Sequence, residues 1–244
     1  VVNLNANATT ARVASLINAI TYRNAETGTL TANTRTVRIT VNDGDGGTSV
    51  NYDNSVVVTA LDSDGNLTAG IGVSEPVALG TTVDTVGEAV SIFDFTLSDG
   101  GTADAIAMAV SQIVVHVSGT ASDTQRSQVT WRLNGPDASN VTGSYSAGSD
   151  TITFSGLSIS IANGGSETYT INAYFNNNTG LTEGLTYILS VDGDTDLTVS
   201  GTRMGTTSAV TNGTGTAISV VATSLAFTTQ PAGSVSGVAL TVQP

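Results

Sequence analysis

The chain has 244 residues, a formal net charge of −13 and no cysteine. Because cysteine is absent and all seven basic residues are arginine, disulfides, thiolate metal sites and lysine chemistry such as Schiff bases or Lys–Asn crosslinks are excluded. An acidic surface repels nucleic-acid phosphates and anionic lipids, and no apolar run approaches the length of a membrane-spanning helix. We therefore expect neither nucleic-acid binding nor membrane insertion.

The composition favours strands joined by tight turns. Valine, isoleucine and threonine suit pleated strands, while 27 glycines and many Asn and Asp residues suit turns. Apolar residues make up 39% of the chain, too many for a disordered protein. We expect a folded, all-β protein.

The first part of the chain contains the one convincing helical pattern. Residues 10–20 place apolar side chains at 3.6-residue spacing, with Thr9 or Thr10 as the N-cap. The elements expected next are strands at 20–23, 35–41 and 55–61, with an Asp/Gly turn at 42–47.

Both ends of the chain have the pattern of partial domains. Residues 1–61 are predicted to be the C-terminal part of a β domain, and residues 223–244 the opening strands of a following domain or a donor strand. Residues 62–72, with three glycines and no periodicity, are predicted to be a linker. Two interpretations remain open: an excerpt from a tandem array, or a subunit whose ends are completed by neighbouring copies.

Residues 73–222 predict a complete antiparallel β-sandwich, immunoglobulin-like or jelly-roll. Strand patterns follow one another at the spacing typical of such domains. The side chains expected to face the core are Phe93, Phe95, Leu97, Ile106, Met108, Val110, Val114, Val129, Trp131, Leu133, Ile152, Phe154, Leu157, Ile159, Ile161, Tyr169, Ile171, Ala173, Phe175, Leu185, Tyr187, Leu189, Val191, Ile218 and Val220.

Asp/Gly-rich turns are the candidate metal sites. Calcium prefers carboxylate and carbonyl oxygens, and alternating aspartates in a bent turn can aim several of them at one ion. An EF-hand is excluded in the last of these turns, because Leu197 and Arg203 occupy its glycine and glutamate positions. Asp-Gly pairs also suit hairpin turns without any ion. The candidate ligands are Asp43, Asp45, Asp62, Asp64, Asp192, Asp194 and Asp196.

No catalytic group is predicted. His116 is the one histidine and lies in a strand pattern, where a structural role is the more common one. Glutamates show no context suited to glycoside chemistry.

Sugar stacking needs exposed aromatic side chains, and the outward candidates are Tyr22, Tyr145 and Tyr174.

Several runs resemble repeats of very large secreted bacterial adhesins. Residues 16–47 read LINAITYRNAETGTLTANTRTVRITVNDGDGG and resemble the C-terminal half of their cadherin-like repeats, where "ITY-N" and "RTVxITVxDGxG" strands recur. The runs EAVSIFDFTLSDGG, TWRLNGPDASNVTGSY and SETYTINAYF are similar to other modules of such proteins, and SLAFTTQPAGSVSG is similar to the entry strand of immunoglobulin-like repeats. The resemblance implies surface display, calcium-stiffened rods and adhesion or matrix formation.

The expected function is therefore that of an extracellular, non-enzymatic structural protein of a surface or matrix fibre. Its partners would be copies of itself or adjacent repeats, joined head to tail by β-strand addition. Residues 1–41 carry a charge of +3 against −16 for the rest, which favours one order of assembly. The alternative is a glycan- or receptor-binding module of an adhesin.

Overall fold

The computed structural model describes residues 7–21, 33–42, 46–58, 62–101 and 106–222, with short stretches at 224, 229, 232–233 and 236–237. The chain divides into two compact units, Val1–Asp62 and Ser63–Pro244, here called unit 1 and unit 2. None of the described helices is long and apolar enough to cross a membrane.

Unit 1 contains one helix and two strands among its described residues: α1 (Thr10–Asn18), β1 (Asn33–Ile39) and β2 (Tyr52–Val58). The Thr9 hydroxyl accepts a hydrogen bond from the Arg12 amide, which confirms the predicted N-cap. The two strands pair antiparallel, and Arg38 of β1 forms a bidentate ion pair with Asp53 of β2 at 2.7 and 2.8 Å.

All three predicted strands of unit 1 differ from the observed elements. β1 spans Asn33–Ile39, two residues earlier at each end than the predicted range 35–41. β2 begins at Tyr52, three residues before the predicted start, and residues 59–61 lie outside the described part. Residues 20–21 are not in a strand, and the rest of the strand predicted at 20–23 also lies outside it.

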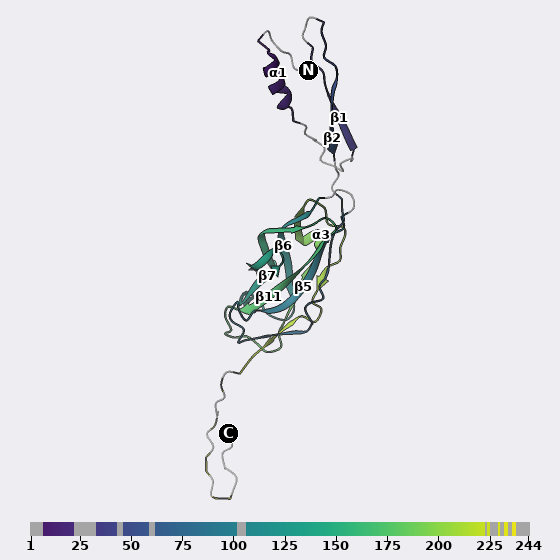
Figure 1. Cartoon of the computed structure of the whole chain (residues 1–244). Coiled ribbons are helices and arrows are strands. Elements are labelled where there is room, and N and C mark those ends of the chain that lie inside the picture. Colours follow the sequence, from purple (N-terminus) through teal and green to yellow (C-terminus); the bar gives the residue numbers. More distant parts are fainter. Residues whose placement is uncertain are drawn as a thin grey trace. The chain divides into compact units, whose positions relative to one another are not determined.

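Unit 2 is built from two β-sheets. One has the order β4-β15-β12-β6-β10-β9, with β13 also on β6 and β14 on β12; the other has the order β3-β5-β11-β7-β8. Figure 1 shows β5, β11 and β7 running alongside one another. The bounds in the first sheet are β4 (Val77–Gly80), β6 (Met108–Ser118), β9 (Ser144–Ser146), β10 (Thr151–Ile161), β12 (Thr186–Val191), β13 (Leu197–Ser200), β14 (Val210–Thr211) and β15 (Thr216–Ser219). Those in the second are β3 (Gly65–Ala69), β5 (Val90–Asp99), β7 (Val129–Gly135), β8 (Ala138–Thr142) and β11 (Ser166–Phe175), and two short helices complete the unit, α2 (Asp123–Ser127) and α3 (Gly193–Asp196).

A single hydrophobic core joins the two sheets. Trp131 of β7 meets Tyr187 of β12 edge to face, with ring centroids 5.6 Å apart and planes at 87°. Both rings are fully buried, as are most of the apolar residues on alternate positions of the long strands. Antiparallel pairing dominates, and the described part is mostly β-structure, so the predicted all-β class is confirmed.

The predicted alternation in β6 is wrong beyond its midpoint. Met108 and Val110 are buried as expected, but Ile113 rather than Val114 faces the core next. The ladders that β6 forms with β10 and β13 both shift register near Ser111. An extra residue at such a bulge reverses the inward and outward positions that follow it.

The predicted linker at 62–72 is also wrong, because β3 lies within it. β3 pairs antiparallel with β5, from Gly65 opposite Asp99 to Ala69 opposite Phe95. Leu67 of this strand is 3% exposed and belongs to the core. Two predicted core residues lie further out than expected, because Ile106 precedes β6 and Val220 follows β15, leaving them 40% and 45% exposed.

Candidate functional site

The three aspartates at α3 belong to one connected set of hydrogen bonds. Thr207 donates its hydroxyl to Asp192 at 2.5 Å, and this hydrogen bond lowers the pKa of Asp192. Asp196 accepts from the Asp192 amide at 2.8 Å with one oxygen, while its other oxygen lies 3.0 Å from Nε2 of His116. The Asp194 amide donates a hydrogen bond to the Thr207 hydroxyl at 3.2 Å. The Thr207 hydroxyl also lies 3.4 Å from the Asp194 carboxylate, so Asp192 and Asp194 share this one partner, while Asp196 bonds to the Asp192 amide and to His116.

A second acidic turn stands where β3 begins. Asp64 accepts a hydrogen bond from the Thr202 hydroxyl at 3.0 Å, and its carbonyl accepts from the Gly100 amide at 3.2 Å. Asp99, at the end of β5, accepts from the Met108 amide at 2.9 Å. The Gly100 bond ties the start of β3 to the end of β5, the Thr202 bond links the start of β3 to the segment after β13, and the Met108 bond links the end of β5 to the start of β6.

Calcium binding stays a prediction. Within the described ranges, no group of three or more His, Asp or Glu side chains is placed to hold a metal ion. Asp62 is the last residue of unit 1, and Asp43 and Asp45 lie outside the described residues.

Asp94 lies in the apolar run of β5 and is only 6% exposed. It was not among the candidate site residues predicted from the sequence. Its carboxylate accepts the Gly72 amide at 2.6 Å, and its carbonyl accepts the Gly70 amide at 3.1 Å. A Cβ atom at Gly70 would stand 2.2 Å from the Asp94 carboxyl carbon, so this contact requires glycine. Asp94 thus fixes the loop between β3 and β4.

Glu75 of the same loop titrates abnormally. Burial and the nearby charge of Asp94 raise the pKa of Glu75 above its ordinary value of 4.5. The folded state therefore holds this proton more tightly than the unfolded state, so the stability of unit 2 falls as the pH rises through the window just above 4.5.

We expect Glu75→Gln to raise the melting temperature near pH 7 and to leave it nearly unchanged at pH ~3, where this carboxyl is almost fully protonated in both states. Glu88→Gln is the matched control. The pKa of Glu88 is lowered by the Thr85 hydroxyl, so its loss should reduce the melting temperature near neutral pH. Thermal melts followed by circular dichroism across this range measure both. A lower neutral-pH melting temperature for Glu75→Gln would contradict the assignment.

The two outward tyrosine candidates that the structure describes, Tyr145 and Tyr174, lie in different sheets. Tyr145 in β9 donates its hydroxyl to Asp150 at 3.0 Å, whereas Tyr174 in β11 belongs to the other sheet. The Arg132 guanidinium lies 6.0 Å from the Tyr174 ring centroid and donates to its hydroxyl at 3.3 Å. Tyr22 lies outside the described residues.

Unit 1 has an apolar groove beside α1. It encloses about 370 Å³, and its lining residues are Ala14, Ile17, Asn18, Ile39, Val41, Ser49, Val50 and Tyr52. Val50 and Tyr52 are 90% and 65% exposed. Apart from Asp62 at its end, every half-buried residue among the described part of unit 1 is Val or Ile, and none of its described residues is fully buried.

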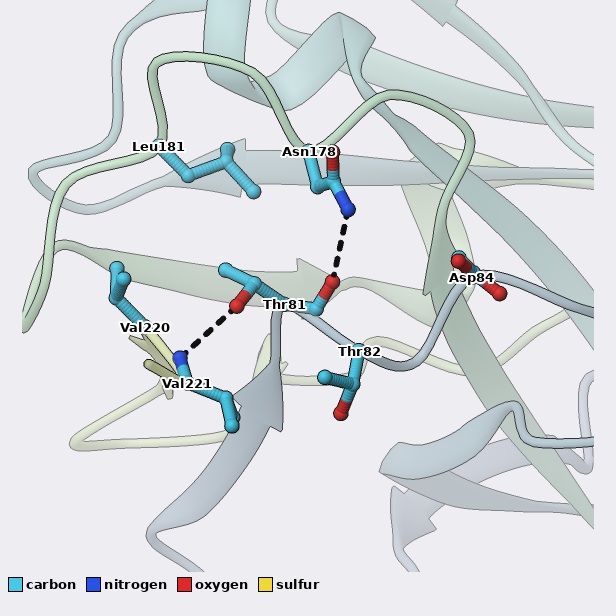
Figure 2. Close-up of a pocket in the computed structure, with 7 residues that line it drawn as sticks. All are labelled: Thr81, Thr82, Asp84, Asn178, Leu181, Val220 and Val221. Atoms are coloured by element: carbon cyan, nitrogen blue, oxygen red, sulfur yellow. Dashed lines mark hydrogen bonds between the residues drawn. The ribbon is translucent and has the colours of Figure 1, made fainter. Parts of the chain in front are cut away.

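Unit 2 has a hollow of about 380 Å³ where the chain leaves β15. Its lining residues are Thr81, Thr82, Asp84, Asn178, Leu181, Val220 and Val221 (Figure 2). Thr81 is the centre of a small network, since its hydroxyl accepts from the Val221 amide at 2.9 Å and its carbonyl accepts from the Asn178 side chain at 3.2 Å. The hollow therefore lies beside a cross-link between the end of β4 and the exit of the chain.

Comparison with known proteins gives no family. No family model matches the chain, and no curated protein matches it. One similar solved structure is described as AvmM, which catalyses macrocyclization in alchivemycin A biosynthesis. The TM-score is 0.30 at 11% identity, over 69% of this chain and 95% of that one. A likeness this weak carries no conclusion about fold or function.

Proposed function

We propose that the chain is an extracellular structural protein of a surface or matrix fibre, assembled head to tail through β-strand addition or as tandem repeats. The observation that carries the proposal is the half-formed core of unit 1. Val37 and Ile39 of β1 and Val56 and Val58 of β2 are half-buried, and no described residue of the unit is buried. A two-stranded sheet with one apolar face is at best marginally stable in water.

Strand addition is the physical route by which such a unit gains a core. Among the described strands, β1 and β2 pair only with each other, so no described strand lies beside the outer edge of either. An incoming strand would gain main-chain hydrogen bonds along that edge and apolar contact with the groove beside α1. Heterologous contacts of this kind extend into filaments rather than closed rings.

We further propose that unit 2 is an immunoglobulin-like sandwich serving as a spacer of that fibre. The strand order supports this assignment. The chain segment that opens unit 2 gives one strand to each sheet, since β3 pairs in one sheet and β4 in the other. The polar groups described above bond mainly to one another, as expected for a structural module. Calcium at the Asp-rich turns would stiffen the rod, and we propose it as the cofactor.

The test of assembly is the size distribution of the purified full-length chain over a range of concentrations, by analytical ultracentrifugation and negative-stain electron microscopy. We expect elongated multimers, and we expect Ile39→Asp to abolish them, because a charge would then lie in the apolar groove. Thr36→Asp, on the exposed face of the same strand, is the matched control and should assemble normally.

Dispersed monomers at every concentration would overturn strand addition between copies. Monomers that bind a glycan array would favour the alternative, a binding module. The same samples melted in calcium and in chelator test the cofactor, and equal transitions would remove calcium from the proposal.

A further inference from the structure

The entering and leaving segments of unit 2 are paired directly with each other. β4 lies near the start of the unit and β15 near its end, and they form a parallel ladder from Val77 opposite Thr216 to Gly80 opposite Ser219. Every other ladder between named strands of the described residues is antiparallel.

The parallel direction determines how tension acts on this pair. When the two ends of the chain are pulled apart, the force on β4 acts at its first residue and points toward the N-terminus. The force on β15 acts at its last residue and points toward the C-terminus. Because the strands are parallel, these forces slide one strand along the other, and the inter-strand bonds must yield together. A pair pulled from the same end would instead open one bond at a time, and each step would meet only the resistance of a single bond.

We propose that the β4–β15 ladder is a mechanical clamp that makes unit 2 resist end-to-end stretching. The inference rests on the proposed structural role, since that role is what would place the chain under tension.

Bonds beyond the last ladder pair strengthen the clamp at the point where tension enters β15. The Thr81 amide donates to the Ser219 carbonyl at 2.9 Å, and the Val221 amide donates to the Thr81 hydroxyl at 2.9 Å (Figure 2). The Val220 amide donates to the Glu183 carboxylate. We call these three contacts the exit bonds. They hold the chain for two residues past the end of the strand.

The core also resists the sliding of β4. Leu79 is fully buried and lies opposite Ile218, which is 1% exposed. A shift of β4 by one residue would turn Leu79 away from the core and expose it to water, because inward and outward positions alternate along a strand. Upstream, β3 is held by five residue pairs on β5, so the tension reaches β4 through a second sheared ladder.

The test is single-molecule stretching of the full-length chain in two pulling directions. In the first, the handles are attached at the two termini, and unit 2 is recognised by an extension on the order of 500 Å, at ~3.5 Å per residue. In the second, one handle is attached at Thr82→Cys, a unique thiol because the chain has no cysteine, and the other at the C-terminus. This direction opens β4 and β15 from the same end. We expect its rupture force to be about half that of the first direction or lower, with the rate of forced unfolding as the governing quantity. Equal forces overturn the clamp.

The exit bonds are tested by comparing Thr81→Ala with Thr81→Ser under constant end-to-end force. Both variants lose the methyl group, but serine keeps the hydroxyl that accepts from Val221. Loss of one such hydrogen bond should speed unfolding about fivefold in the alanine variant relative to serine. Equal rates would remove the exit bonds from the clamp. Each measurement is made on one tethered chain, so its result does not depend on whether separate copies assemble. A negative result would therefore count against the clamp and not against the proposed fibre.

Discussion

Trp131→Ala is expected to lower the free energy of unfolding of unit 2 by about 3–5 kcal/mol, the usual cost of removing a large buried aromatic side chain. Trp131 is 1% exposed and fills the space between the sheets against Tyr187, 5.6 Å away. Its neighbours come from opposite sheets and cannot both collapse into the cavity. The measurement is urea unfolding followed by far-ultraviolet circular dichroism, because this residue is the one tryptophan of the chain.

Ile71→Ala is the control for this substitution. Ile71 is 101% exposed in the loop between β3 and β4, so its truncation should change stability by no more than about 0.5 kcal/mol. A comparable loss in both variants would mean that the core does not lie where the two sheets meet.

Gly119→Ala should have the second largest effect, a loss of about 2–4 kcal/mol, because two penalties combine at this position. Gly119 follows β6 with φ of +100°, a conformation that disfavours any side chain. A Cβ atom there would also stand 2.3 Å from the Thr186 carbonyl oxygen, which is backbone and cannot rotate away. Chemical denaturation of both proteins gives the difference.

Gly156→Ala separates the two penalties. Gly156 has φ of +68° but no atom within 4 Å of the added Cβ, so this variant should lose only about 1 kcal/mol. If the two alanine variants were equally stable, the close approach of Gly119 to Thr186 would have no energetic weight.

The long strands of unit 2 were predictable because their apolar residues alternate over many positions. Trp131 and its strand neighbours face the core as the pattern indicates, and so do Tyr187 and Leu189 of β12. The pattern fails in β6 because a bulge near Ser111 inserts an extra residue, and nothing in the composition of that run marks it. Alternation predicts which side a residue faces only while the register holds.

β3 was missed for a different reason. It has five residues, begins with glycine and contributes one buried side chain, Leu67. Such a segment carries too little periodicity to be told from a loop, and it forms a strand because β5 offers it an edge. The signal for it lay in β5, where an acidic residue, Asp94, interrupts an apolar run and needs backbone donors from a neighbouring segment.

For the candidate metal residues, the sequence does not distinguish a calcium site from a hydrogen-bonded turn. Aspartates at alternate positions suit calcium, and they equally suit a turn closed by its own hydroxyls and amides. At α3 the second arrangement is present, with Thr207 between Asp192 and Asp194 and with His116 against Asp196. Which donor a carboxylate finds depends on strands that are distant in sequence, and spacing alone does not specify it.

The pairing of β4 with β15 also governs the order in which unit 2 can be completed. During synthesis β4 emerges early, but its partner is the last of the described strands to be made. Until then β4 and the edge of β12 are unpaired, and a contact between residues so far apart in sequence forms slowly because a long loop must close first. We therefore expect the first sheet of unit 2 to be completed only after β15 has been made.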